Sequence, residues 1–306
     1  MLVTNKDIQL EAQKKGYAVP AFNTSNLEMT KAIVEVAEEL KSPVIIATST
    51  SAISYAGIQE IANIVRGLGQ KASVPVSLHL DHGTDFDLII QCIRNGWTSV
   101  MIDASHHPLE ENIQATKEIA KIAHAAGVSV EAELGQLAGI EDNIVVDSAN
   151  AHLTDPEQAK QFVEESNCDT LAVAIGTSHG AYKFAGESNL DFKRLAEIRE
   201  KVSVPLVLHG ASSVYPEWVD RFKRSGGEMK PAHGVSDDHI KTAISHGITK
   251  INIDTDLRIA FTTALREFLN ENPAQFDPRK ILKAPTEALK EIVAGKMKLM
   301  GSAGQA

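Results

Sequence analysis

Eight short segments rich in valine and isoleucine recur along this chain of 306 residues, separated by longer stretches with helical periodicity. Near-continuous apolar runs of this length are typical of strands in a parallel sheet covered on both faces. An alternation of strand and helix repeated eight times predicts a (β/α)8 TIM barrel in the α/β class. The expected strands span residues 17–23, 43–49, 75–81, 98–103, 128–133, 170–176, 204–209 and 249–254.

The stretches between the expected strands have the apolar spacing of amphipathic helices. These expected helices span residues 28–40, 58–68, 110–125, 156–165, 191–201, 261–269 and 285–300. No low-complexity linker or block of like charge divides the chain, so we expect one barrel domain over residues 1–306, including C-terminal helices at about 260–300. The main interruptions are two expected loops, at 136–153 and 224–235.

Composition excludes several classes of partner. The formal net charge of −10 disfavours nucleic acid and anionic membrane surfaces. No apolar run approaches the roughly 18 residues that a membrane span requires, and the N-terminal segment lacks the pattern of a signal or transit peptide. Two cysteines are too few for a disulfide scaffold. We therefore expect a cytoplasmic protein with a small-molecule partner.

Polar or ionisable side chains terminate every expected strand. In a (β/α)8 barrel the C-terminal ends of the strands meet at one rim, where active sites are built. Residues far apart in the sequence are therefore expected to converge there. The strand-end residues are Asn23, Ser49, Asp81, His82, Asp103, Glu133, His179, His209, Asn252 and Asp254.

Three of these strand-end residues are histidines, His82, His179 and His209, and glycine follows each one. Three protein ligands with one open coordination position are typical of a catalytic zinc site. A single histidine is more often structural than a metal ligand, but three at successive rim positions predict a metal centre. His79 is expected to point into the barrel, either as a supporting partner or as a packing residue.

Glycine-containing turns after the last three strands suit an anion. Successive backbone N–H groups in such a turn form a phosphate nest, and the usual phosphate site of these barrels lies in this region. A single glycine is better explained as a simple turn residue, but the three loops together favour a phosphate site. The residues grouped here are Gly180 with Lys183, Gly210 with Ser212, and Asp254 with Thr255.

Seven motifs, in order along nearly the whole chain, closely resemble those of the class II, zinc-dependent fructose-bisphosphate aldolases. They are AFN (21–23), HLDHG (79–83), SVMIDASHH (99–107), VEAELG (130–135), AIGTSHGAYK (174–183), LVLHGAS (206–212) and NIDTDLR (252–258). The resemblance implies reversible cleavage of fructose 1,6-bisphosphate to dihydroxyacetone phosphate and glyceraldehyde 3-phosphate, as in glycolysis and gluconeogenesis.

The resemblance also implies roles for individual residues. His82, His179 and His209 match the zinc ligands of the family. Asp81 matches the acid/base that acts at the C4 hydroxyl of the hexose, and Glu141 matches a glutamate that exchanges the proton at C3 of the triose.

Further matches concern metal and substrate contacts. Asp103 and Glu133 match either a second metal position or residues that support the first. The resemblance also implies a monovalent cation, Na⁺ or K⁺. Arg258 resembles an arginine that reaches the second phosphate, in some members across a dimer interface, so we expect a homodimer or homotetramer. The remaining substrate contacts are Asn23, Ser49, Gly180, Lys183, Gly210, Ser212, Asn252, Asp254 and Thr255.

Three alternatives stay open at this point. Tagatose-1,6-bisphosphate aldolases share the fold, the zinc site and most motifs, although the NIDTDLR run favours the fructose branch. A Schiff-base aldolase would need a strand-end lysine, and the sixth strand ends in Ala174, Ile175 and Gly176 instead. A non-catalytic zinc scaffold would be expected to lack Asp81 or Glu141, and both are present.

Overall fold

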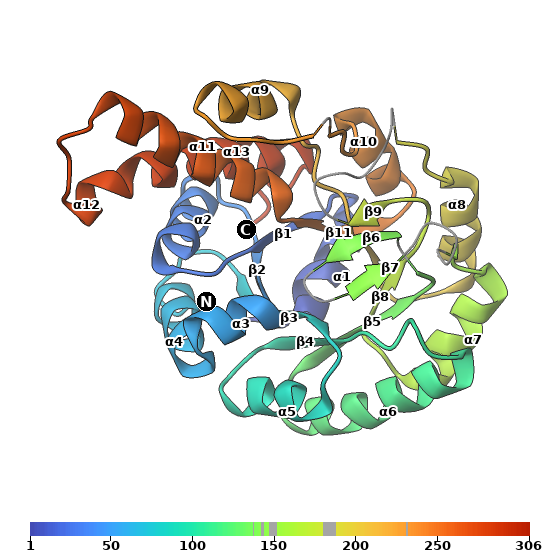
Figure 1. Ribbon diagram of the computed structural model, residues 1–306. Coiled ribbons are helices and arrows are strands. Elements are labelled where there is room, and N and C mark those ends of the chain that lie inside the picture. The colour runs from blue at the N-terminus through green and yellow to red at the C-terminus, as the bar shows by residue number, and fades with distance from the viewer. Residues whose placement is uncertain (137, 142–143, 147–151, 180–187, 231) are drawn as a thin grey trace.

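Eight parallel strands close into a barrel in a computed structural model that describes residues 1–136, 138–141, 144–146, 152–179, 188–230 and 232–306 (Figure 1). The strand order around the barrel is β1-β11-β10-β8-β5-β4-β3-β2, with helices outside, which confirms the predicted TIM-barrel fold. The barrel strands are β1 (Val19–Asn23), β2 (Val44–Ser49), β3 (Val76–Gly83), β4 (Ser99–Ile102), β5 (Ser129–Leu134), β8 (Thr170–Val173), β10 (Leu206–Leu208) and β11 (Ile248–Ile253).

Alternation along the strands separates an apolar outer face from a polar interior. In β3, Leu78 and Leu80 belong to the core between the barrel and its helices, whereas His79 and Asp81 contact residues of other barrel strands. Successive side chains of a strand point to opposite faces, so the leucines face the helices and the polar residues face inward. The interior of the barrel therefore carries ionisable groups up to its rim.

Helices follow the barrel strands as the periodicity predicts. The seven expected helices correspond to α2 (Leu27–Glu39), α4 (Ile58–Gly69), α6 (Leu109–Ala125), α7 (Pro156–Ser166), α8 (Phe192–Lys201), α11 (Thr255–Glu271) and α13 (Lys283–Leu299). The N-termini of α2 and α7 are capped by Asn26 and Asp155, whose side chains accept backbone N–H groups of the first turn. Helix α11 begins at Thr255, directly after β11, and not at residue 261.

In the part of the chain that the structure describes, six further helices have no counterpart in the prediction: α1 (Asn5–Lys15), α3 (Thr50–Ala56), α5 (Phe86–Arg94), α9 (Pro216–Arg224), α10 (Asp237–Ser245) and α12 (Pro278–Ile281). Helix α1 contacts β1, β5 and β11 and lies behind the barrel opening in Figure 1. Thr249, at the start of β11, donates a hydrogen bond to Gln9 of α1. Helix α1 therefore covers the N-terminal end of the barrel, opposite the expected site.

The expected loop at 136–153 is in part ordered as strand, so that prediction is wrong in part. Strands β6 (Ala138–Glu141) and β7 (Ile144–Val146) pair antiparallel, and β6 also pairs with the short strand β9 (Ser178–His179). At the base of this segment Gln136 and His152 exchange two backbone hydrogen bonds. The three strands form a small sheet at the side of the barrel where β5 and β8 end (Figure 1).

Helix α13 packs on the outside of the barrel. It packs on α11 and α2 and also contacts β1. Its buried residues include Leu289, Val293, Met297 and one charged residue, Lys296. Among the described residues no helix has the length and apolar character needed to cross a membrane.

Candidate active site

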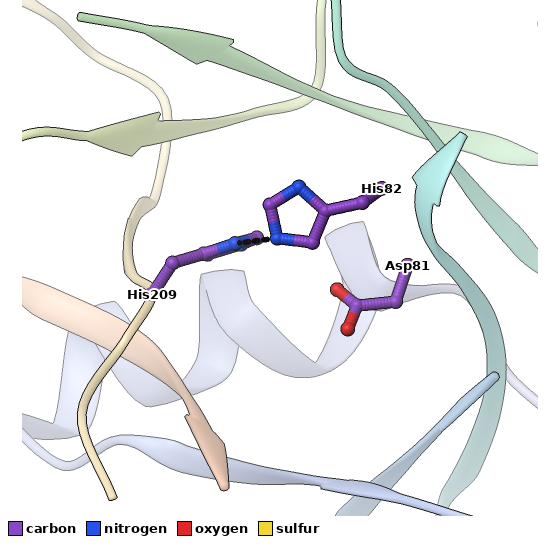
Figure 2. A group of neighbouring side chains, drawn as sticks. All are labelled: Asp81, His82 and His209. Carbon is purple, nitrogen blue, oxygen red and sulfur yellow. Dashed lines mark hydrogen bonds between the residues drawn. The ribbon is translucent and has the colours of Figure 1, made fainter. Parts of the chain in front are cut away.

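Asp81 and His82, at the end of β3, meet His209, which directly follows β10 (Figure 2). His209 Nδ1 lies 2.7 Å from His82 Nε2, and the two rings are nearly perpendicular with centroids 4.5 Å apart. The three residues offer ligand atoms that all lie within 4.8 Å of one another, and all three side chains are buried. Residues that are 127 positions apart thus converge at one rim.

The backbone at His82 has an uncommon conformation. Its φ is +49°, in the left-handed region that residues other than glycine rarely adopt, and the register between β3 and β4 shifts between Leu80 and Gly83. Beyond the shift, Asp103 N donates to Gly83 O at 2.8 Å. Backbone strain of this kind persists where the surroundings hold it, and here it orients the imidazole of His82.

Two carboxylates hold the two histidines. His82 Nδ1 lies 2.8 Å from Asp103 Oδ2, and His209 Nε2 lies 2.8 Å from Glu131 Oε1. Since a carboxylate accepts hydrogen bonds, each ring donates its proton to its carboxylate and keeps a lone pair on the other nitrogen. When both rings are neutral these two lone pairs face each other across the 2.7 Å contact between His82 and His209, whereas a proton on one of the two nitrogens makes the contact a hydrogen bond.

Two acceptor nitrogens at this distance repel each other unless a shared proton or a cation bound by both of them satisfies their lone pairs. A metal-bound histidine characteristically donates its second ring nitrogen to a carboxylate, as both His82 and His209 do here. The donor set therefore fits a divalent metal ion at the facing nitrogens.

Asp103 is an ionised partner of His82. Burial acts to raise the pKa of its carboxyl, but hydrogen bonds from His82 and Ser105 outweigh burial and hold that pKa well below its usual range. Ser105 contributes both its hydroxyl and its backbone N–H to Asp103 Oδ1, at 2.7 and 3.2 Å. Asp103 therefore keeps its negative charge and orients His82.

Glu133 is a third carboxylate close to both histidines. Its Oε2 is 3.9 Å from His82 Nδ1 and 3.7 Å from His209 Nδ1. With His82 and Asp103 it forms a second group of ligand atoms within 4.8 Å of one another. This arrangement suits either a second metal position or a residue that supports the first.

A buried charge cluster lies beneath the site, and of its members only the inward-pointing His79 was predicted from the sequence. Lys250 Nζ donates to both carboxylate oxygens of Glu131, at 2.7 and 2.9 Å, and lies 3.3 Å from His79 Nε2. Burial first, and then Lys250, lower the pKa of His79 to about 3, so this histidine is neutral. Glu131 links this interior cluster to the metal-facing His209.

The sequence does contain a signal for this cluster, which is the alternation of inward-facing and outward-facing side chains along β5 and β11. The segments SVEAEL and ITKINI place Glu131 and Lys250 two residues before Glu133 and Asn252, which are strand-end residues. Residues two apart in a strand share a face. Glu131 and Lys250 are therefore the next inward positions below the rim.

Asp81 is held by two amides. Asn23, at the end of β1, donates its Nδ2 to Asp81 Oδ2 at 2.9 Å, and Asn252 of β11 donates its Nδ2 to Asp81 Oδ1 at 2.8 Å. The carboxylate is only 1% exposed. A buried carboxylate fixed in orientation beside a metal-binding group is able to accept or return a proton at a defined point.

Polar groups of the turn after β10 meet the start of α11. Gly210 has a φ of +63°, and the buried Ser212 accepts a hydrogen bond from the backbone N–H of Asp254 at 3.2 Å. Thr255 is the first residue of α11. The predicted phosphate-binding groups Gly210, Ser212 and Thr255 thus belong to two adjoining segments.

A pocket of about 370 Å³ opens beside Asp81 and includes Asn23, Ser49, Asp254 and Arg258 in its lining. Arg258 donates from Nε to Asp254 Oδ1 at 2.9 Å, and its Nη2 lies 2.8 Å from Asp254 Oδ2. Its side chain is 61% exposed. Arg258 therefore stands at the mouth of the pocket and not within the buried site.

The remaining predicted residues are described only in part. His179 and Glu141 lie in β9 and β6, which belong to the same small sheet, and their side chains lie outside the described part of the chain. Gly180 and Lys183 lie outside the described residues.

Comparison with known proteins agrees with this geometry. The model of the family "Fructose-bisphosphate aldolase class-II" matches residues 3–305. The chain is 53% identical over 306 residues to a fructose-bisphosphate aldolase of Thermus caldophilus, and 49% identical to one of Helicobacter pylori, with full coverage of both chains in each case. It also resembles the crystal structure of the YdjI aldolase of Escherichia coli K12, with a TM-score of 0.83, 39% identity and full coverage of both chains.

A closed (β/α)8 barrel with a buried histidine–carboxylate group at its rim defines a metal-binding barrel enzyme. The chain belongs to the class II fructose-bisphosphate aldolase family.

Proposed function

We propose that Asp81 is the acid/base in a class II aldolase that reversibly cleaves fructose 1,6-bisphosphate to dihydroxyacetone phosphate and glyceraldehyde 3-phosphate. Membership of the family supports the reaction. The observation that carries the role of Asp81 is its buried carboxylate, held by Asn23 and Asn252 beside the two facing histidines.

The metal in this proposal is zinc, held by His82, His179 and His209. The support is the pair of facing ring nitrogens of His82 and His209, since imidazole is a common zinc ligand. When bound, such an ion supplies Lewis-acid polarisation of the substrate ketone. Glu133 and Asp103 are candidates for a second divalent position, and a monovalent cation, Na⁺ or K⁺, is a further familial expectation.

In the cleavage direction, Asp81 removes the proton of the C4 hydroxyl. The C3–C4 bond then breaks, C4 becomes the aldehyde carbon of glyceraldehyde 3-phosphate, and the electron pair remains with the three-carbon fragment as an enediolate. Glu141 returns a proton to C3 of that fragment, giving dihydroxyacetone phosphate. In condensation the same groups act in reverse, and Asp81 protonates the aldehyde oxygen.

The phosphorylated ends of the substrate are assigned to the loops after the last strands. Gly180, Lys183, Gly210, Ser212 and Thr255 bind one phosphate in this proposal. This assignment is supported by the contact between the turn after β10 and the start of α11, where Ser212 accepts the backbone N–H of Asp254. Backbone N–H groups at a helix N-terminus favour an anion.

Asn252 and Asp254 contact the triose part, Asn23 and Ser49 line the neighbouring pocket, and Arg258 reaches the second phosphate from the pocket mouth.

The assembly proposed is a homodimer or homotetramer in the cytoplasm. The large exposed apolar side chains Tyr55 and Phe276, 78% and 90% exposed, support an oligomer because burial of such residues between subunits is favourable.

The experiment that tests the function compares cleavage of fructose 1,6-bisphosphate and tagatose 1,6-bisphosphate by the purified protein. Each substrate is assayed before and after treatment with EDTA and again with zinc restored. We expect cleavage of the fructose substrate that is lost with the chelator and returns with zinc. Preference for tagatose would assign the chain to the related specificity, and cleavage resistant to chelation would contradict the metal mechanism.

A further inference from the structure

The turn at residues 211–215 is anchored from beneath by a buried carboxylate. Asp256, in the first turn of α11, accepts the backbone N–H of Ser213 at Oδ2 and that of Val214 at Oδ1, at 2.9 and 2.7 Å. Val214 has a φ of +50°, a costly conformation for a β-branched residue. The two hydrogen bonds to Asp256 hold the turn in this strained form.

A lysine from the far end of the chain neutralises that carboxylate. Lys296 of α13 is 1% exposed, and its Nζ lies 3.1 Å from Asp256 Oδ2. The same Nζ donates to Ser213 Oγ at 2.6 Å and lies 4.5 Å from the ring centre of Tyr215. A buried charge is tolerated when it is paired and hydrogen-bonded, and both conditions hold for Lys296 and Asp256.

The pair lies next to the groups assigned to phosphate. Ser212 directly precedes Ser213 and accepts the backbone N–H of Asp254, while Thr255 directly precedes Asp256. Without Lys296, Asp256 would place an uncompensated negative charge one residue from each of two proposed phosphate contacts. That charge would repel a phosphate dianion at short range and low dielectric constant.

We propose that Lys296 and Asp256 are positioning residues for phosphate recognition, in which Asp256 shapes the 211–215 turn and Lys296 cancels the charge that this shaping introduces. This inference rests on the proposed function, because it takes Ser212 and Thr255 as phosphate contacts. It assigns to the C-terminal helix a part in substrate affinity, although Lys296 itself does not touch the substrate in this proposal.

The test is a cycle of Lys296→Met, Asp256→Asn and the double variant, with inorganic phosphate titrated by calorimetry and steady-state cleavage of fructose 1,6-bisphosphate measured in parallel. The net charge of the pair is 0 in the wild type, −1 in K296M, +1 in D256N and 0 in the double variant. We expect K296M to weaken phosphate binding and raise KM by about 10-fold, with a smaller change in kcat. Among the variants that carry asparagine at 256, the double variant should bind phosphate more weakly than D256N does, just as K296M does relative to the wild type.

A matched control lies on the same helix. Lys290 of α13 pairs with Glu35 Oε2 at 2.8 Å on the outer surface, so Lys290→Met removes the same kind of charge away from the turn. It should leave the phosphate affinity unchanged. If K296M does not fold, D256N and the double variant still differ by the charge of residue 296 alone. D256N should then bind phosphate more tightly than the double variant.

Phosphate affinities that do not follow the charge of the pair would overturn the inference. A folded K296M with the affinity of the wild type, or a double variant with the affinity of D256N, would be such a result. Failure of the proposed function is a separate outcome, because it would appear as absence of fructose 1,6-bisphosphate cleavage in the wild type.

Discussion

The chemistry assigned to Asp81 depends on which atoms hold its carboxylate. Both oxygens accept an amide N–H, one from Asn23 and one from Asn252, so the group is fixed in orientation while still ionised. A carboxamide of the same shape would lose the capacity to take a proton. Asparagine also places a donor against the amide of one neighbour.

We expect Asp81→Asn to lower kcat for fructose 1,6-bisphosphate by about 10²- to 10⁴-fold, the range typical of a lost general base. Zinc content, measured by mass spectrometry of the purified variant, should equal that of the wild type because the histidines are unchanged. The matched variant His209→Ala should lose zinc and activity together. Full activity in Asp81→Asn would remove the acid/base assignment.

Glu131 acts on the metal site through His209. Burial acts to raise the pKa of its carboxyl, but Lys250 first and then His79 lower that pKa well below the usual range, so Glu131 accepts the Nε2 proton of His209 as an anion. An anionic partner holds the ring with its Nδ1 lone pair toward His82.

Glu131→Gln should weaken zinc binding by about 10- to 100-fold, the usual effect of losing such a supporting partner. Competition with a fluorescent zinc chelator measures the dissociation constant directly and needs no turnover. Glu157→Gln on α7, which alters an exposed ion pair with Lys201 of α8, is the control and should leave zinc affinity unchanged. Wild-type affinity in the Glu131 variant would show that the carboxylate does not orient His209.

At the level of elements, β3 contributes most of the site because it bears Asp81, His82 and the glycine that follows. A Cβ added to Gly83 would lie 2.5 Å from the carbonyl oxygen of Met101 and 2.8 Å from Leu80 Cδ2. The strand can therefore approach β4 beyond the register shift only if residue 83 has no side chain. That approach brings Asp103, just after β4, to His82.

Gly83→Ala should lower the free energy of unfolding by about 1–3 kcal/mol, the cost typical of overpacking, and should also weaken zinc binding. Urea unfolding followed by circular dichroism gives the first quantity and chelator competition the second. Gly67→Ala on α4 is the control, since a Cβ there meets nothing within 4 Å. Equal stability of the Gly83 variant and the wild type would contradict this account.

The barrel elements were predictable because their signal is local. Strands such as β2 and helices such as α4 carry a clear apolar pattern, and their observed bounds differ from the predicted ones by one residue at most. Helix α1 is mostly polar and covers the barrel end, so its fold depends on contacts with distant strands. The small sheet of β6, β7 and β9 likewise depends on pairing between segments that local periodicity does not relate.

The candidate site was predictable at its rim, and below the rim only the inward position of His79 was predicted. Strand ends identify Asp81, His82 and His209 without any knowledge of pairing. The link from Glu131 to Lys250 depends on which strands face each other across the closed barrel. Such a contact becomes visible only when the register around the whole barrel is fixed.

For the whole molecule, the buried interior charges couple folding to pH. His79 has a pKa of about 3 when folded and an ordinary value of 6.5, so between these values the unfolded chain binds a proton that the folded chain does not. Stability from this group is therefore present above pH 6.5 and is lost as pH falls toward 3. The lowered pKa of Asp103 and of Glu131 adds a loss in the same direction below their ordinary values.

We expect the free energy of unfolding of EDTA-treated protein to fall as pH decreases from 6.5, with His79 contributing a slope of up to about 1.4 kcal/mol per pH unit. Urea titrations at several pH values between 7.5 and 4.5 measure it. His79→Gln should flatten the decrease between pH 6.5 and 4.5, whereas His233→Gln in the loop before α10 should not. An unchanged slope in His79→Gln would mean that other groups carry the acid sensitivity.

Metal binding should also raise the Tm of the entire barrel, because a ligand that binds only the folded state stabilises it by mass action. Zinc at about 1,000 times its dissociation constant would contribute about 4 kcal/mol, so chelation should lower Tm by several degrees. Far-ultraviolet circular dichroism should stay the same, because His82 and His209 lie at the ends of β3 and β10, and the packing of the strands on the helices does not depend on them. His209→Ala should have the lower Tm with or without added zinc, because it lacks one of the two facing ring nitrogens. If zinc raised the Tm of this variant as much as that of the wild type, the stabilising ion would bind elsewhere.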